Sequence, residues 1–490
     1  MKFIVKNLNI ATGGILVAVL NQKDAKKLDL RSGDRLMVHH GKNELTCIID
    51  ISKNKKAVQE GRIGLFEEVF ERLHVRQGME VEVHLTGKPE SIGHIRDKLQ
   101  GKHLGYQELY HIMDDFTNDR LTDIEKTYFV AATFTKGLSM EETVDLTRAM
   151  VETGKKIKFP GISVDKHSIG GLPGNRTTMI LVPIIAAAGF TIAKTSSRAI
   201  TSAAGTADSM ECLAKVELTE AQIRKVVKKT GGCMVHGGAI QLAPADDKII
   251  EVEHPLSIDP EGQLLASVMA KKYSVSSQYV LIDIPLGKTT KVKSRSKAKH
   301  LKRMFEHVGK KLGMQIKVII TDGSQPIGRG VGPLLEAEDV LAVLRNDHAA
   351  PQDLKKKAVM MAGLMLEMTG KYKDGFKVAS EILESGKAFK KMQEIIAAQG
   401  KIKKPGMGAY SYPLRCPCLG RVREIDNEMI AKIARIAGAP EDKGAGLYLQ
   451  KKVHDRVKHG DVLYTIFAES KFKLELAKEF ARKNRGYAVG

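Results

Sequence analysis

The chain has 490 residues, of which 43% are apolar and 28% charged, and its formal net charge is +21. This length is too great for one hydrophobic core and predicts several domains. No apolar run reaches the roughly 20 residues that cross a bilayer, and residues 1–9 (MKFIVKNLN) lack the apolar segment of a secretory signal. We therefore expect a cytoplasmic globular protein with no membrane partner.

The positive charge favours an anionic partner, such as nucleic acid, acidic lipid or a phosphorylated metabolite. Basic side chains spread over a solvated surface would give the same total. The sequence has no Trp and only 5% aromatic residues, which argues against a nucleic-acid binder that stacks single-stranded bases. The odd, scattered set of five cysteines predicts no disulfide framework, and the C-x-C pair Cys416 and Cys418 favours a structural role over a metal site.

The N-terminal segment contains a repeat. Residues 28–39 (LDLRSGDRLMVH) match residues 73–84 (LHVRQGMEVEVH) at a spacing of 45 residues. Each copy shows a turn with Arg and Gly followed by an alternating strand. Two such copies predict a small pseudo-symmetric β-barrel with little helix, which closes its own edges. We expect this part to serve assembly or positioning, because it shows no catalytic motif.

Helical spacing of apolar residues begins after Gly87 and is clearest over 121–136 and 139–153, where Ser139 and Glu142 form a capping box. From residue 162 short apolar strands, glycine-rich turns and apolar helices alternate, which predicts a largely parallel sheet. The expected strands lie at 162–164, 191–193, 280–284 and 316–320, and residues 179–190 form an apolar buried segment containing Pro183.

Helical patterns return over 352–370 and 375–398, and a Pro/Gly/Tyr-rich junction at 405–413 precedes strands at 447–453 and 462–467 and a charged helix at 469–485. The predicted fold is therefore multidomain α/β and α+β. The expected domains are a β-barrel (1–86), a helical domain (87–160), a central α/β domain with a mostly parallel sheet (161–346), a helical connection (347–404) and a C-terminal α+β domain (405–490).

Two polar loops carry the chemistry. The first, VDKHSIGGLPGNRTT at 164–178, follows a strand and precedes an apolar helix. Its glycines let backbone N–H groups approach an anion, and the following helix N-terminus favours negative charge. The second, KTSSRAITSAAGTAD at 194–208, holds six hydroxyl side chains and an arginine. An ordinary glycine-rich turn and simple helix capping are the plainer alternatives, but two such loops at successive strand ends would face one crevice.

The runs KHSIGG at 166–171 and SSRAITSAAGTADSME at 196–211 resemble the signature of the thymidine/pyrimidine-nucleoside phosphorylase family. The resemblance extends from about Leu104 to the C-terminus and includes GAGLYL at 444–449 and VKHGD at 457–461. The additional N-terminal barrel makes archaeal members that cleave AMP the most similar branch. The resemblance implies phosphorolysis of nucleoside 5′-monophosphates, with AMP preferred and CMP and UMP as further candidates, to free base and ribose 1,5-bisphosphate.

The resemblance also assigns site residues. It implies that the attacking phosphate is bound by Lys166, Ser168, Ser196 and Thr206. It implies that the nucleotide is bound by Gly171, Ser197, Arg198, Ala199, Ile200, Thr201, Ser202, Thr206, Ser267, Lys271 and Lys291, and that Asp259 donates the proton to the departing base. Inorganic phosphate is then a co-substrate, with no cofactor and no metal, and the family implies a homodimer or a larger homo-oligomer.

Departures from the family pattern bear on specificity. Members that cleave pyrimidine nucleosides usually have a GVGDK-like run where this chain has GLPGNR at 171–176, and a histidine where it has Ser202. Loss of a large imidazole could open room for a purine or a 5′-phosphate. A pyrimidine-nucleoside phosphorylase is therefore the less favoured alternative.

The chemistry suits these residue types. Cleavage of the glycosidic bond leaves positive character at C1′ and negative charge on the base, and a carboxylic acid kept protonated by its surroundings can neutralise the base. Asp259 is the candidate, although an aspartate before Pro260 is also typical of a plain turn.

Two rivals remain. An anthranilate-type phosphoribosyltransferase would share the architecture but use magnesium and diphosphate, and only Asp208 and Glu211 offer acidic groups near the second loop. A basic nucleic-acid-binding protein would explain the net charge but not the two loops; we expect no nucleic-acid partner.

Overall fold

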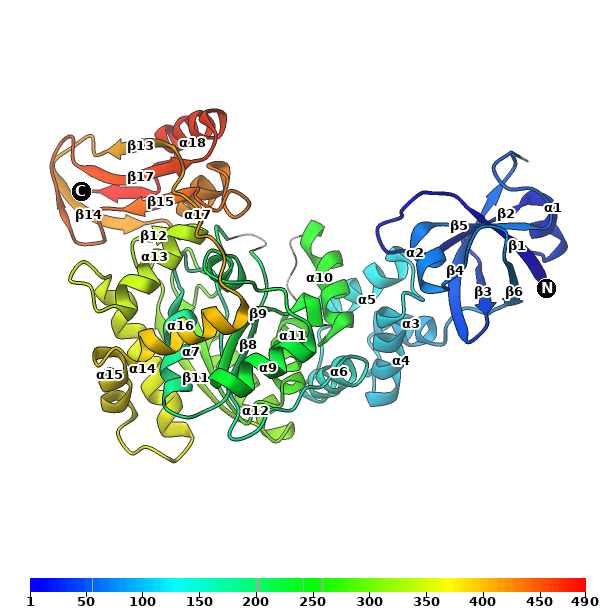
Figure 1. The fold of residues 1–490 in the computed structure, drawn as a ribbon, viewed down its shortest axis with the longest axis horizontal. Coiled ribbons are helices and arrows are strands. Elements are labelled where there is room, and N and C mark those ends of the chain that lie inside the picture. The colour runs from blue at the N-terminus through cyan, green and yellow to red at the C-terminus, as the bar shows by residue number, and fades with distance from the viewer. Residues whose placement is uncertain (55, 200–201, 241, 257, 259) are drawn as a thin grey trace. The chain divides into compact units, whose positions relative to one another are not determined.

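The structure, a computed structural model, describes residues 1–490 except 55, 200–201, 241, 257 and 259. The chain forms two compact units, one of Met1–Gly154 with Ala243–Ser267 and one of Lys155–Leu242 with Val268–Gly490. Figure 1 gives the labels of the helices and strands. Within the described residues, no helix combines the length and apolar character needed to span a membrane.

The N-terminal strands close into a barrel in the order β1-β5-β2-β4-β3-β6, which confirms the predicted barrel. They are β1 (Lys2–Asn7), β2 (Val17–Asn21), β3 (Arg35–His40), β4 (Asn43–Ser52), β5 (Arg62–Leu65) and β6 (Glu80–Leu85), with short helices α1 (Gln22–Lys27) and α2 (Glu67–Arg72). Alternating side chains such as Phe3 and Val5 fill the interior. The strands of the two repeats, β3 and β6, pair directly, with Met37 opposite His84.

Four helices follow the barrel: α3 (Ser91–Leu99), α4 (Tyr106–Thr117), α5 (Asp123–Lys136) and α6 (Met140–Glu152). The predicted capping box at Ser139 and Glu142 is present. A later helix, α10 (Pro244–Leu256), contacts α4, α5 and α6, and Lys248 donates a hydrogen bond of 3.0 Å to the carbonyl of Thr117. The helical bundle is therefore built from two separate stretches of the chain.

The central domain contains a parallel sheet, as predicted. Strand β10 (Tyr279–Leu286) pairs in parallel with β7 (Val164–Ser168) and with β11 (Gln315–Asp322), and β8 (Ile192–Ser196) pairs in parallel with β9 (Gly232–His236). The apolar segment containing Pro183 forms helix α7 (Thr177–Ala187), whose residues from Thr177 to Ala186 are all buried. The other helical elements are α8 (Thr206–Met210), α9 (Glu220–Thr230), η1 (Gly238–Ile240), α11 (Glu261–Ser274), α12 (Arg295–Lys311) and α13 (Pro333–Leu344).

The helical connection consists of α14 (Gln352–Met368), α15 (Gly375–Glu384) and α16 (Lys387–Gln399). The pattern over 375–398 is thus two helices, which separate at Gly386, a residue with a φ of 75° that is favourable for glycine. Buried side chains of these helices join those of α7 and α13 in one large apolar core.

The C-terminal domain is α+β, as predicted. Strands β13 (Tyr410–Arg415), β17 (Val462–Ala468) and β15 (Gly446–Leu449) lie side by side (Figure 1), and β12 (Gly330–Val331) from the central domain extends their sheet. A second sheet joins β16 (Arg456–Val457), β14 (Gly420–Ile425) and β18 (Tyr487–Val489), and the helices are α17 (Asn427–Ile436) and α18 (Lys471–Lys483). Part of the expected junction at 405–413 is the strand β13, which lies at the edge of its sheet beside β17, and Pro413 is tolerated at this edge.

Candidate active site

The two polar loops follow neighbouring parallel strands. The amide of Val164 at the start of β7 donates to the carbonyl of Thr191 at 2.9 Å, and the amide of Thr191, just before β8, donates to the carbonyl of Ile162 at 3.0 Å. A parallel bridge joins Ser163 to Thr191. Since the carboxyl ends of adjacent parallel strands meet at one edge of a sheet, the loops that leave β7 and β8 emerge together.

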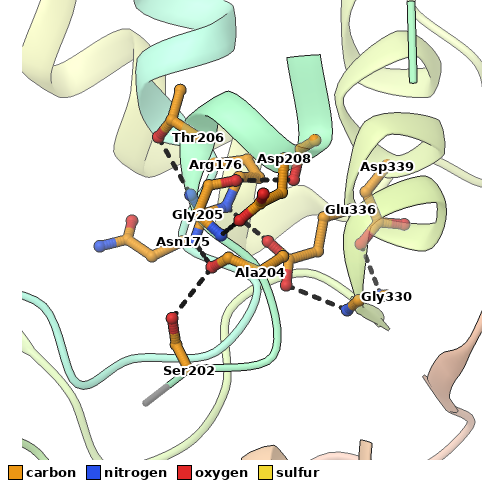
Figure 2. A network of polar contacts seen from close by, with 12 residues as sticks. Asn175, Arg176, Ser202, Ala204, Gly205, Thr206, Asp208, Gly330, Glu336 and Asp339 are labelled. Carbon is orange, nitrogen blue, oxygen red and sulfur yellow. Dashed lines mark hydrogen bonds and ion pairs between the residues drawn. The ribbon is translucent and has the colours of Figure 1, made fainter. Parts of the chain in front are cut away.

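Arg176 links the two loops directly, as Figure 2 shows. Its guanidinium donates to the hydroxyl of Thr206 at 3.0 Å and to the carbonyl of Ala204 at 3.1 Å. The same guanidinium pairs with buried Glu336 on α13, Nε to Oε2, at 2.5 Å. Burial raises the pKa of Glu336, and the charge of Arg176 opposes this rise. The two loops therefore converge, as the sequence predicted, and a buried ion pair fixes the arginine that joins them.

Asp283 in the middle of β10 organises the first loop. The hydroxyl of Ser168 donates to its carboxylate at 3.1 Å, and the side-chain amide of Asn175 donates to Ser168 at 3.2 Å. Lys357 from α14 forms an ion pair with Asp283 at 2.9 Å. Burial alone would raise the pKa of Asp283, but the ammonium groups of Lys357 and Lys166 outweigh it and lower the pKa.

Lys166 is almost wholly buried, with 1% of its surface exposed. Its ammonium donates to the hydroxyls of Thr177 and Thr178, at 3.0 and 3.4 Å, at the start of α7. Burial lowers the pKa of Lys166 to about 7, although the negative charge of Asp283 works in the opposite direction. An anion placed against this ammonium would favour its charged form.

A second buried charge group lies beside the first. Asp165 pairs with Lys272 at 2.6 Å and with Lys194 at 3.5 Å. Burial, together with the charges of Lys272 and Lys194, holds the pKa of His167 well below its ordinary value.

The buried charges around these strand ends are unequal in number. The basic side chains are Lys166, Arg176, Lys194, Lys272 and Lys357, and the carboxylates that pair with them are Asp165, Asp283 and Glu336. Among the described residues five basic groups thus pair with three carboxylates, a fourth buried carboxylate, Asp208, lies in the second loop, and burial lowers the pKa of Lys166 and of Lys194. Buried charge is costly unless it is paired, so this arrangement suits the binding of an additional anion.

Asp208 at the start of α8 holds the second loop in shape. Its carboxylate accepts from the amides of Ala199 and Gly205, at 2.7 and 2.8 Å. Gly205 is required for close approach, because a Cβ there would lie 2.7 Å from the carbonyl oxygen of Ser197. Ser202 donates to the carbonyl of Ala204 at 3.1 Å (Figure 2). These contacts give the loop a defined conformation.

Arg198, which we predicted to bind the nucleotide, is held by carboxylates of the protein. Both its terminal nitrogens bind Glu211 at 2.7 Å, and one of them also pairs with Glu217 at 2.9 Å. The hydrogen bond from Arg198 lowers the pKa of Glu211 to about 2, and Lys443 pairs with the same carboxylate at 2.8 Å. These contacts fix the loop, and a direct role of Arg198 in nucleotide binding stays a prediction.

Ser196, at the end of β8, differs from the other predicted phosphate ligands. Its hydroxyl oxygen is buried and has no hydrogen-bond partner among the described residues, whereas Lys166, Ser168 and Thr206 are each hydrogen-bonded within the protein. A buried unsatisfied hydroxyl is unfavourable and indicates a missing partner. The position of Ser196 at the start of the second loop is consistent with a bound anion.

The structure describes some, but not all, of the residues that we predicted to bind the nucleotide. Gly171 has a φ of 79° and lies against the backbone of Lys291, since a Cβ at Gly171 would be 2.5 Å from the amide nitrogen of Lys291. Ser267 and Lys271 are four residues apart on α11, a spacing that places them on one helical face. The remaining predicted residues, Ile200, Thr201 and Asp259, lie outside the described residues.

Several residues of this arrangement were not predicted from the sequence: Asn175, Arg176, Asp283, Glu336 and Lys357. Asp283 carries a visible signal, because a charged residue interrupts the apolar strand YVLIDIPL. Lys357 and Glu336 lie on helices whose sequences show nothing unusual at these positions. Their importance follows only from pairing with residues more than 70 positions away.

Comparison with known proteins identifies the class. The α/β domain of a glycosyl transferase family matches residues 161–389, and the helical bundle domain of that family matches residues 93–154. The pyrimidine nucleoside phosphorylase C-terminal domain matches residues 421–488. The domains thus define a glycosyl transferase of a type that also carries a phosphorylase C-terminal domain.

Proteins that are similar to nearly the whole chain specify this class further. AMP phosphorylase 1 of Archaeoglobus fulgidus is 44% identical over 97% of this chain and 95% of its own length. The AMP phosphorylase of Pyrococcus furiosus is 46% identical over 98% and 96%. A Legionella pneumophila protein provisionally named thymidine phosphorylase is 43% identical over 93% and 88%. The chain therefore belongs to the thymidine/pyrimidine-nucleoside phosphorylase family, which includes the proteins named AMP phosphorylase.

A solved structure shares the fold of the central part. Anthranilate phosphoribosyltransferase from Thermus thermophilus matches 62% of this chain and 98% of its own, with a TM-score of 0.54 and 18% identity. At this identity the likeness concerns the fold alone.

Proposed function

We propose that the protein catalyses the phosphorolysis of nucleoside 5′-monophosphates, with AMP as the preferred substrate. The observation that carries this proposal is the junction of the two polar loops through Arg176, beside an excess of buried basic groups. Such a junction suits a substrate pair with two phosphate groups. The full-length similarity to proteins named AMP phosphorylase supports the same activity.

In the proposed reaction inorganic phosphate is the nucleophile. One phosphate oxygen forms a bond to C1′ of the ribose as the bond from C1′ to the base nitrogen breaks. The electron pair of that bond leaves with the base, which takes a proton from Asp259. The products are the free base and ribose 1,5-bisphosphate. Because phosphate attacks directly, the scheme needs no protein nucleophile, cofactor or metal.

We assign the attacking phosphate to Lys166, Ser168, Ser196 and Thr206. The unpartnered hydroxyl of Ser196 supports this assignment, since a phosphate oxygen would supply the acceptor it lacks. The lowered pKa of Lys166 supports it too, because the anion would restore the charge that burial disfavours. The nucleotide is assigned to Gly171, residues 197–202, Thr206, Ser267, Lys271 and Lys291.

One assay tests the proposal. AMP, CMP, UMP, adenosine and thymidine are each incubated with the enzyme in EDTA, with and without phosphate, and free base is measured. We expect phosphate-dependent release, fastest from AMP and slow from both nucleosides. Release from thymidine at the rate of AMP would favour a nucleoside phosphorylase. A requirement for Mg²⁺ and diphosphate would instead favour the phosphoribosyltransferase chemistry.

We also propose that the enzyme acts in the cytoplasm, where nucleoside monophosphates are available, and that it is a homodimer or larger. The side chains of Ile124 and Tyr128, one turn apart on α5, are 70% and 53% exposed, which supports contact with a further copy. Light scattering on the purified chain measures the assembly directly; a strictly monomeric, fully active enzyme would refute the oligomer.

A further inference from the structure

Three potential metal ligands meet in the helical bundle, outside the proposed phosphate and nucleotide contacts. Glu90 directly precedes α3 and already has helical backbone angles, with φ −59° and ψ −32°. Four residues further on, His94 therefore lies on the same face as Glu90. Helix α4 contacts α3 and contributes His111. The ligand atoms of these three side chains all lie within 4.8 Å of one another.

One ligand-to-ligand distance falls within the range of a tetrahedral zinc site, and a second lies just outside it. Nε2 of His94 is 3.4 Å from Nδ1 of His111, and Oε2 of Glu90 is 3.8 Å from the same nitrogen of His111. Zinc binds histidine nitrogen and carboxylate oxygen at about 2.0–2.2 Å, so adjacent ligand atoms in a tetrahedron are about 3.3–3.6 Å apart. A modest inward rotation of the Glu90 side chain would complete this spacing.

A direct hydrogen bond between the two imidazoles explains only part of the arrangement. It would account for the 3.4 Å contact between the rings, which are stacked with 25° between their planes. It does not bring in the carboxylate, because 3.8 Å from Glu90 to His111 is too long for a hydrogen bond, and the contact is an ion pair only when His111 is protonated. An ion at the centre of the three groups would bind all of them at once.

The site is also accessible. Glu90 and His111 line a cavity of about 500 Å³ between the barrel and the bundle, to which Asp114 and Arg120 also contribute. Asp114 pairs with Arg120 at 2.6 Å and so does not compete for the ion. The cavity gives solvent access to the ligands, and water from it could occupy a fourth position.

We propose that Glu90, His94 and His111 bind a Zn²⁺ ion. Two imidazole nitrogens and one carboxylate oxygen suit zinc, whereas Mg²⁺ and Ca²⁺ prefer oxygen ligands throughout. The ion would join the beginning of α3 to α4, immediately after the linker Gly87–Pro89 that leaves the barrel. Its effect would be to fix the direction in which the chain enters the bundle.

Zinc binding to the untagged, EDTA-treated full chain tests this site. The exposed Cys418 is first replaced by Ser, because a free thiol also binds zinc. Titration against a chromophoric chelator should then give one equivalent of tightly bound Zn²⁺, undiminished by millimolar Mg²⁺. His94→Ala and His111→Ala should each weaken binding by about a hundredfold or more, since loss of a direct ligand exceeds the loss of an outer partner. The matched control His103→Gln, an exposed histidine of the same bundle, should retain the full affinity.

A second measurement does not depend on the variants folding well. Co²⁺ added to the Cys418→Ser protein should give the intense visible absorption of four-coordinate cobalt, and one equivalent of Zn²⁺ should remove it. Absence of stoichiometric zinc in this protein, a weak six-coordinate cobalt spectrum, or unchanged affinity in both histidine variants would each overturn the proposal.

Discussion

Replacing Lys166 by Met should stabilise the phosphate-free protein while it abolishes phosphate binding. Burial lowers the pKa of Lys166 from 10.5 to about 7. At about 1.4 kcal/mol per pKa unit, this corresponds to a burial cost of about 5 kcal/mol when the group is charged. The attraction to Asp283 is already contained in this value. Methionine removes the cost but also removes hydrogen bonds to Thr177 and Thr178, at about 1 kcal/mol each. We expect a net gain of about 3 kcal/mol, within the range for replacement of buried charges.

The stability that Lys166→Met gains over the wild type should fall as the pH rises. Because the folded pKa lies below the unfolded one, the unfolded chain binds more protons between about pH 7 and 10.5, so wild-type stability rises across that window. The advantage of Lys166→Met should therefore be greatest below about pH 7, fall to zero near about pH 9 and reverse at higher pH, where the wild type keeps its hydrogen bonds without the cost of a buried charge.

Calorimetric melting at pH 6 and pH 9, with and without phosphate, measures both effects. Wild-type Tm should rise with phosphate, and the Tm of Lys166→Met should be higher at pH 6 but insensitive to phosphate. Lys403→Met, at an exposed position of the same unit, is the control and should change neither property. A Met variant that melts below wild type at pH 6, or that phosphate still stabilises, would refute this account of Lys166.

Four further substitutions separate the roles within the site. Asp259→Asn should leave nucleotide binding intact and reduce turnover by roughly a hundredfold or more; near-normal turnover would remove Asp259 from the mechanism. Ser196→Ala should leave Tm unchanged, because its hydroxyl has no partner within the part of the chain that the structure describes, and raise the KM for phosphate about tenfold; an unchanged KM would contradict the assignment. Arg176→Met should lower stability by about 3 kcal/mol, since it leaves Glu336 buried without its cation; adding Glu336→Gln should restore Tm but not activity, and recovery of both would show that the arginine matters only to stability. Gly171→Ala should raise the KM for AMP about tenfold and lower Tm, because its φ is 79° and the new Cβ would meet the adjacent backbone at 2.5 Å; wild-type kinetics in this variant would show that the close approach is unimportant.

Local signals in the sequence were enough to predict much of the fold. The capping box at Ser139 marks the start of α6 within one residue, and the alternating repeat identifies the barrel strands. These features depend on neighbouring residues only. The return of α10 to the bundle could not be predicted in this way, because it depends on contacts such as that of Lys248 with Thr117, 131 positions apart.

The same distinction between local and long-range signals applies to the candidate active site. The loops around Lys166 and Thr206 were visible because glycines and hydroxyl residues interrupt apolar segments, and parallel-sheet geometry then predicts that they meet. The charged groups that determine the electrostatics of these loops could not be identified from the sequence. Asp283, Lys357 and Glu336 lie within regular elements, and their pairing is decided by packing between distant segments.

The divided first unit affects how the protein can fold during synthesis. Helices α4, α5 and α6 are made early, but α10, which contacts all three, is translated only after Lys155–Leu242 has emerged. At about 5–20 residues per second this interval lasts roughly 5 to 20 seconds. During that time the surfaces of α4, α5 and α6 that α10 later contacts stay open to the surrounding solution, so a chaperone or an identical nascent chain can bind there until residue 256 is made.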